Sequence, residues 1–175
     1  MTARPLIVTG TPFAAWLAQP PFGGTADPRP ATAALAAWHD DALGTGAQRL
    51  GALASGQPLA LNAAQRQALH ALPMGERGQT FVVEPRACWT LPELAKAWPD
   101  AHFVLVAEHP LAALSTWLRR ADVEDEDPWA ALDLWVGGAG RLWAHARAHP
   151  GRCTLVDAAE LRRAPRAWID RCRRD

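Results

Sequence analysis

The chain has 175 residues, which fits a single domain over residues 1–175, and its 18 basic and 18 acidic side chains cancel. A formal charge of zero argues against binding nucleic acid through an overall basic field, and against an acidic tail protein. Lys96 is the only lysine and there is no tyrosine, so chemistry at a lysine amine has one candidate and chemistry at a phenol has none.

The first half of the chain opens with an apolar run, Leu6–Thr9, closed by Gly10-Thr11-Pro12, which predicts a buried strand followed by a turn. The proline- and glycine-rich stretch Gln19–Pro30 predicts a loop. Three helices are predicted next, each from a start signal or an apolar stripe: Pro30–Leu43, Ala47–Ala54, and a helix from an Asn62–Gln65 capping box to about Leu72.

The second half alternates short apolar runs with helical segments. Strands are predicted at Thr80–Val83, His102–Ala107 and Thr154–Val156. Helices are predicted from a Thr90–Glu93 capping box to about Trp98, at Pro110–Arg120, at Pro128–Ala148 and in the arginine-rich tail. Because strands alternate with helices, we expect an α/β fold in three layers, with a mostly parallel sheet flanked by helices.

The long helix over residues 128–148 combines large apolar side chains with glycines. Its apolar face is assigned to Leu132, Trp135, Val136, Leu142 and Trp143. Gly137, Gly138 and Gly140 each weaken such a helix by roughly 1 kcal/mol relative to alanine. Nine tryptophans are more than a core of this size easily hides, so the sequence predicts an exposed tryptophan-rich surface for a partner protein or a second copy.

The three cysteines, Cys88, Cys153 and Cys172, stand far apart without a CxxC pair. This sparse, odd number is typical of a reducing compartment and predicts no disulfide framework. No apolar run approaches about 18 residues, and the N-terminus lacks a secretory apolar stretch. We therefore expect a cytoplasmic protein that binds neither membrane nor nucleic acid.

In parallel sheets ligands bind beyond the carboxyl ends of the strands, so the residues that follow each predicted strand are the candidates for a site. Gly10 and Thr11 stand where a phosphate-binding loop would lie, with a small residue and a hydroxyl. Because no lysine or arginine occurs between Gly10 and Arg29, an ordinary turn between strand and helix is the alternative.

Carboxylates follow the second and third predicted strands. Glu84 and Glu108 would form an acid/base pair if those strands are adjacent. The alternative is that each carboxylate simply pairs with an arginine, Arg86 or Arg119. His109 stands where a general base would be useful, although a histidine at a helix start more often caps the helix.

Three further features are weaker. His145 and His149 have the i, i+4 spacing of shared metal ligands, but no third ligand is evident, so we expect no metal. The acidic run Asp122–Asp127 lacks the glycine and distal glutamate of a calcium loop. The tail Leu161–Arg174 carries six arginines that would suit phosphate or an acidic partner, although a solvated helix end is the simpler interpretation.

Taken together these segments resemble the sulfotransferase family, especially the bacterial sulfotransferase-like proteins. Phe81–Arg120 is similar to the family segment in which a Lys-Asp-Pro-Arg element precedes a strand, followed by Arg-His/Asn-Pro and a helix bearing a serine. Ile7–Ala18 resembles the family's donor loop, and Leu155–Leu161 resembles its Tyr-Glu-Asp-Leu segment. The resemblance implies a P-loop/sulfotransferase-like fold and 3′-phosphoadenosine 5′-phosphosulfate as sulfuryl donor.

The resemblance also implies positions for the site, and the chain departs from the family at several of them. It implies donor-binding residues at Gly10, Arg86 and Thr116, with Ser115 beside Thr116. The Thr11 hydroxyl joins these binding candidates, and Glu84 and His109 are the candidates for catalysis, because of their places after the predicted strands. The donor-loop arginine of the family falls on Phe13, the lysine of its Lys-Asp-Pro-Arg element on Val83, and the arginine for the 3′-phosphate on Glu108. Each lost charge-assisted hydrogen bond is worth roughly 1.5–3 kcal/mol.

Two functions are therefore kept. The first is a sulfotransferase-like protein with a degenerate donor site, non-catalytic and without a cofactor, that acts as a binding or scaffold partner. The second is an active transferase that uses 3′-phosphoadenosine 5′-phosphosulfate, or a related enzyme with a shifted phosphate or sulfate site.

Overall fold

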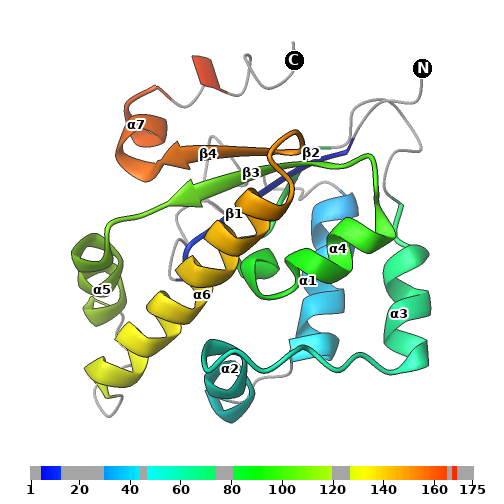
Figure 1. Cartoon of the computed structure of the whole chain (residues 1–175), viewed down its shortest axis with the longest axis horizontal. Helices are drawn as coiled ribbons and strands as arrows, with labels where there is room; N and C mark the ends of the chain where they lie inside the picture. The colour runs from blue at the N-terminus through cyan, green and yellow to red at the C-terminus, as the bar shows by residue number, and fades with distance from the viewer. Residues whose placement is uncertain are drawn as a thin grey trace.

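The computed structural model describes residues 5–12, 30–43, 47–73, 81–119, 127–164 and 167–168. Figure 1 shows how the helices and strands of these residues are arranged. The strands are β1 (Leu6–Gly10), β2 (Phe81–Val83), β3 (His102–Ala107) and β4 (Cys153–Asp157). The helices are α1 (Pro30–Leu43), α2 (Ala47–Ala54), α3 (Ala63–His70), the 3₁₀ helix η2 (Pro85–Trp89), α4 (Leu91–Ala97), α5 (Pro110–Leu118), α6 (Pro128–Ala148) and α7 (Ala158–Arg163).

The four strands form one parallel sheet in the order β2-β1-β3-β4. Ile7 of β1 pairs with Val82 on one side and with Phe103 on the other, and Leu105 of β3 pairs with Leu155 of β4. The expected α/β class is confirmed, with a parallel sheet flanked by helices. Since parallel neighbours need crossover connections, each return of the chain brings a helix onto the sheet.

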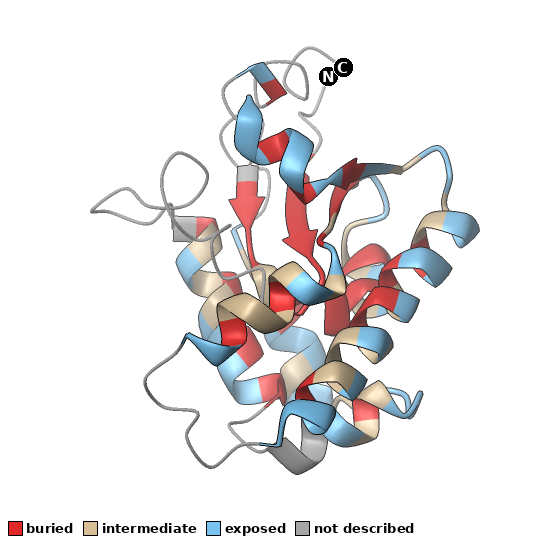
Figure 2. Cartoon of the chain, turned by 90° about the vertical axis from the view of Figure 1, so that its left-hand side faces the viewer, coloured by how far each residue is buried: buried red, intermediate tan, exposed pale blue. Residues whose placement is uncertain are grey.

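Alternating side chains place two apolar clusters on the two faces of the sheet. The larger cluster joins one face to helices α1 to α4 and α6, and its strand members are Ile7, Val82, Phe103 and Leu105. The smaller cluster joins the other face to α7 and Trp168, and its strand members are Leu6, Val8, Val83, Val104, Val106 and Val156. Figure 2 shows the buried strands between the helices. No helix among the described residues is long and apolar enough to cross a membrane.

Most predicted boundaries are confirmed within two residues, and the Asn62–Gln65 capping box is present, with reciprocal hydrogen bonds of 2.8 and 3.1 Å. The predicted Thr90 capping box is wrong. Thr90 precedes α4 but its side chain makes no capping hydrogen bond, because its hydroxyl lies 2.7 Å from Nε2 of the buried His39. The helix instead starts with Pro92 in its first turn, directly after η2.

The apolar face predicted for α6 is partly wrong. Val136 and Trp143 are exposed, while the buried positions are Ala131, Gly138, Ala139, Leu142 and His145. The helix buries its small residues because neighbouring segments pack against its backbone. A β-carbon on Gly137 would lie 2.5 Å from the Cα of Ala54 in α2, and one on Gly138 would lie 2.2 Å from the Pro12 ring. The glycines that weaken α6 thus permit its close packing.

The end of α2 is held against α6 by one arginine. Gly56 follows α2 with a φ of 90°, and the backbone N–H groups of Gly56 and Gln57 donate to the carbonyls of Leu53 and Ala52, which is the Schellman arrangement. Arg141 of α6 donates to the carbonyl of Leu53 at 2.7 and 3.1 Å and to that of Gln57 at 2.6 Å. A cation is well placed there, because the carbonyl end of a helix is its negative pole.

We expect Arg141→Met to lower the free energy of unfolding by about 1–3 kcal/mol, because the charge-assisted hydrogen bonds to the half-buried Leu53 carbonyl and to the Gln57 carbonyl are lost. Denaturant melts would measure the change. Arg66→Met serves as the control: Arg66 also donates to a carbonyl, that of Leu61, but within an exposed segment. We expect the control to change the free energy by less than about 0.5 kcal/mol. Equal effects would contradict the role assigned to Arg141.

Candidate functional site

The carboxyl ends of the four strands meet at one edge of the sheet, and hydrogen bonds continue past the strands there. The N–H of Thr11, after β1, donates to the carbonyl of Val106 in β3 at 3.0 Å. The N–H of Glu84, after β2, donates to the carbonyl of Val8 in β1 at 3.0 Å. This edge therefore fixes the backbone of the residues that sequence analysis singled out, and it is the candidate site.

Glu84 is buried and caps the 3₁₀ helix that follows it. Its Oε1 accepts from the backbone N–H of Arg86 and from Nε of the same residue, both at 3.0 Å. A carboxylate at a helix start suits the positive pole of the backbone. The predicted pairing of Glu84 with Arg86 is confirmed, so both oxygens of this carboxylate face a guanidinium.

Arg86 extends this pair into a bridge to α1. Its Nη1 donates to the exposed Asp40 at 2.5 Å, and its Nη2 donates to the carbonyl of Ala36 at 3.1 Å. The hydrogen bond from Arg86 lowers the pKa of the Asp40 carboxyl below its usual value. All three nitrogens of the guanidinium thus donate to groups of the chain itself, which fixes η2 to α1 through charge-assisted hydrogen bonds.

A second ion pair lies at the neighbouring strands. Glu108, after β3, is buried and pairs with Arg162 of α7, not with the Arg119 that the sequence suggested. The N–H of Glu108 donates to the hydroxyl of Thr11 at 3.2 Å. The Thr11 hydroxyl oxygen therefore accepts a hydrogen bond from the backbone that follows β3. The position that the family resemblance assigns to an arginine is therefore a carboxylate with an arginine opposite it.

Glu84 and Glu108 do not follow adjacent strands, because β1 lies between β2 and β3. The condition for the proposed carboxylate pair is therefore not met. Each carboxylate instead has its own arginine, Arg86 or Arg162. The two buried carboxylates that the structure describes at this edge are thus each compensated by an arginine, as buried charges generally are.

The remaining predicted site residues lie at or beyond the end of β3. His109 is exposed, and its Nδ1 accepts from the N–H of Leu111 at 3.3 Å, so it caps α5. Ser115 and Thr116 are half-buried in α5, and the Thr116 hydroxyl donates to the carbonyl of Ala112 at 3.0 Å. Gly10 is buried at the end of β1. The rest of the segment that resembles the donor loop, Phe13–Ala18, lies outside the described residues.

His39 is a buried polar residue that the sequence analysis did not single out. Its Nδ1 lies 3.0 Å from the carbonyl of Leu35, one turn earlier in α1, which can only accept. Nδ1 must therefore carry the proton, and Nε2 accepts from the Thr90 hydroxyl at 2.7 Å. Burial lowers the pKa of His39 to about 4, with opposing contributions from Glu84 and Arg86. The neutral ring thus links α1 to Thr90, the residue before α4, through one hydrogen bond on each side.

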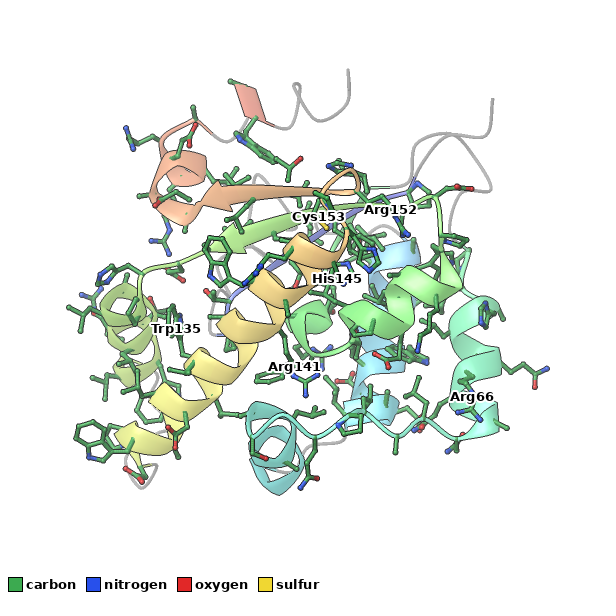
Figure 3. The ribbon with its side chains drawn as sticks, in the orientation of Figure 1. Arg66, Trp135, Arg141, His145, Arg152 and Cys153 are labelled. Carbon is green, nitrogen blue, oxygen red and sulfur yellow. The ribbon has the colours of Figure 1, made fainter. Side chains whose placement is uncertain are left out.

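His145 is buried on the inner side of α6, near Arg152 and Cys153 (Figure 3). Its ring meets Phe103 edge-on at 5.0 Å and His149 at 4.6 Å between centroids, and its Nε2 has no hydrogen-bond partner. Burial, followed by the charges of His149 and Arg152, lowers the pKa of His145 to about 4. Among the described residues no group of three or more ligand-type side chains is placed to hold a metal ion.

Comparison with known proteins adds no assignment to this geometry. No model of a known protein family matches the chain, and no curated protein matches it.

Proposed function

We propose that this chain is a sulfotransferase-like protein that does not transfer sulfuryl groups and acts by binding a partner protein. The resemblance of its segments to that family motivates the first part of the proposal. The observation that carries the second part is the compensated charge at the carboxyl edge of the sheet. Arg86 and Arg162, the cations described there, are each paired with a buried carboxylate.

A donor that carries phosphate and sulfate groups needs cationic and N–H donors aimed at its oxygens. To bind it here, Arg86 would have to leave Glu84, Asp40 and the Ala36 carbonyl. Withdrawing one partner of a fully buried pair costs about 3–5 kcal/mol. The side chain of Arg86 is 41% exposed, so the cost here is smaller, but the buried Glu84 would still be left without its cation. Arg162 is engaged by the buried Glu108 in the same way, so withdrawing this cation would carry a similar cost. These terms together oppose the affinity that a donor site requires.

Support for a binding role comes from the exposed apolar side chains of α5 and α6. They include two tryptophans, and the set is Leu111, Leu118, Trp129, Val136 and Trp143. Aromatic residues are enriched at protein–protein interfaces relative to the rest of the surface, so a group of exposed tryptophans favours a binding role.

We expect the melting temperature of the protein to stay constant when 3′,5′-adenosine bisphosphate is added at millimolar concentration. A ligand that binds only the folded state stabilises it by RT ln(1 + [L]/Kd), so micromolar affinity would raise the melting temperature by several degrees. Sulfate at the same ionic strength is the control for a general salt effect. A rise specific to the nucleotide would overturn the proposal and favour the active transferase.

A further inference from the structure

A buried nitrogen on the inner side of α6 lacks a hydrogen-bond partner. His145 is 6% exposed, and its Nε2 makes no hydrogen bond to any residue that the structure describes. Buried polar atoms nearly always have a partner, so an exception calls for a physical reason, such as a bound ion. Trp135 also has an unpaired nitrogen, but an indole N–H can only donate, whereas an imidazole nitrogen can hold a metal ion.

A second imidazole lies against the ring of His145. His149 directly follows α6, is half-buried, and has its ring centre 4.6 Å from that of His145. Metal–nitrogen bonds to imidazole measure about 2.0–2.1 Å, so two rings that share one ion at a right angle have their centres about 4.5 Å apart. The separation of the two rings therefore suits a shared ion. We name these two residues the histidine pair.

We propose that the histidine pair binds one divalent transition-metal ion of the class of Cu²⁺ and Ni²⁺, with water in the remaining positions. Imidazole nitrogen suits these ions, and ligands at right angles are typical of their square-planar or tetragonal geometry. Among the described residues no third ligand-type side chain completes the set. The site therefore differs from a structural zinc site, in which four protein ligands enclose the ion.

Two neighbouring side chains limit which ion fits the pair. Figure 3 shows Arg152 and Cys153 near His145, at the start of β4. Arg152 donates to the carbonyls of Ala101 at 3.3 Å and Trp98 at 3.1 Å, and its charge opposes any cation nearby. Hard cations such as Ca²⁺ and Mg²⁺ depend on oxygen ligands, which the two imidazoles do not offer. The Cys153 thiol packs against the larger apolar cluster and is not counted as a ligand.

The histidine pair lies at the opposite edge of the sheet from the candidate site. His145 contacts Phe103 near the start of β3, whereas Glu84 and Glu108 follow the ends of their strands. The inference therefore goes beyond the proposed function and does not depend on it. An ion shared by the two rings would hold His149 against the last turns of α6. Because such an ion binds the folded chain, we expect it to raise the melting temperature.

Calorimetric titration of the untagged full chain with nickel chloride tests the site, after dialysis against EDTA and then against metal-free buffer. Ni²⁺ is the probe because Cu²⁺ would oxidise free thiols such as that of Cys153. We expect a saturating isotherm with one ion per chain, and a melting temperature several degrees higher in excess Ni²⁺.

Variants of the pair and of two other residues assign the site. His149→Gln and His145→Leu each remove one of the two protein ligands and should weaken Ni²⁺ binding at least about ten-fold. His70→Gln, at an exposed histidine in the last turn of α3, and Cys153→Ser, beside the pair, are the matched controls. Both controls should keep the wild-type affinity. Circular dichroism checks that all four variants fold.

A wild-type chain that gives no saturating heat with Ni²⁺, or a folded His149→Gln variant with wild-type affinity, would overturn the inference. A loss of affinity in Cys153→Ser would overturn it as well, because the ion would then be held through sulfur. None of these results touches the proposed function, which depends on the absence of nucleotide binding.

Discussion

Gly137→Ala is expected to lower the free energy of unfolding by about 2 kcal/mol, although alanine is the better helix former. The new methyl group would lie 2.5 Å from the Cα of Ala54 and 2.7 Å from its carbonyl oxygen. These are backbone atoms, so relief requires α2 to move away from α6. Overpacking of this kind costs about 1–3 kcal/mol and sometimes more, which exceeds the gain of roughly 1 kcal/mol in helix propensity. Urea melts followed by circular dichroism would measure the difference.

Gly51→Ala provides the matched control on the other helix of this contact. Gly51 lies inside α2, is exposed, and has nothing within 4 Å of its missing β-carbon. The same substitution should therefore raise the free energy of unfolding by up to about 1 kcal/mol. A stabilising Gly137→Ala, equal to Gly51→Ala, would show that α2 and α6 do not approach as closely as described.

Acid is expected to destabilise the fold through two histidines as the pH falls from about 6.5 toward 4. Burial lowers the pKa of both His39 and His145 from 6.5 to about 4 in the folded chain. Between these values the unfolded chain binds protons that the folded chain does not, so stability rises with pH across this window. Above pH 6.5 this contribution is on the order of 3 kcal/mol for His39 and smaller for His145, whose ring is less fully enclosed. Both contributions are lost as the pH passes 4.

Variants separate the two histidines from the acidic groups that titrate nearby. His145→Leu should reduce the proton uptake on unfolding at pH 5 by close to one, because the Nε2 of His145 gives up no hydrogen bond. His39→Gln should do the same, while also weakening the fold at pH 7 through the lost contacts to Leu35 and Thr90. An unchanged slope in both buried variants would contradict the neutral state assigned to these rings.

The strands and most helices were predictable because their signals are local. The run over residues 102–107 is apolar at almost every position, as a strand covered on both faces must be, and the Asn62–Gln65 capping box is a short-range pattern. The buried face of α6 was not predictable from apolar side chains alone. Glycine and alanine give no hydrophobic signal in the sequence. Their small size nevertheless lets α2 and the turn at Pro12 pack against this face of α6, so Val136 and Trp143 lie on the exposed face.

The candidate site was predictable in its location but not in its pairings. That Glu84 and Glu108 follow strands can be deduced from the sequence, and so can the local pair of Glu84 and Arg86. The pairing of Glu108 with Arg162 depends on α7 lying beside β3, which is a consequence of the order of the strands. The contact between His39 and Thr90 likewise joins residues 51 positions apart. Only the packed fold brings such groups together.

The central claim of the proposal is that Arg86 and Arg162, the cations that the structure describes at the carboxyl edge of the sheet, are engaged by Glu84 and Glu108 and do not bind an anionic donor. Calorimetric titration of the wild-type protein with 3′-phosphoadenosine 5′-phosphosulfate at low ionic strength tests this claim most directly, because weak screening favours any anion site that exists. We predict heats that do not differ from those of dilution. A saturating isotherm with micromolar affinity would contradict the claim and show that the site still binds the donor.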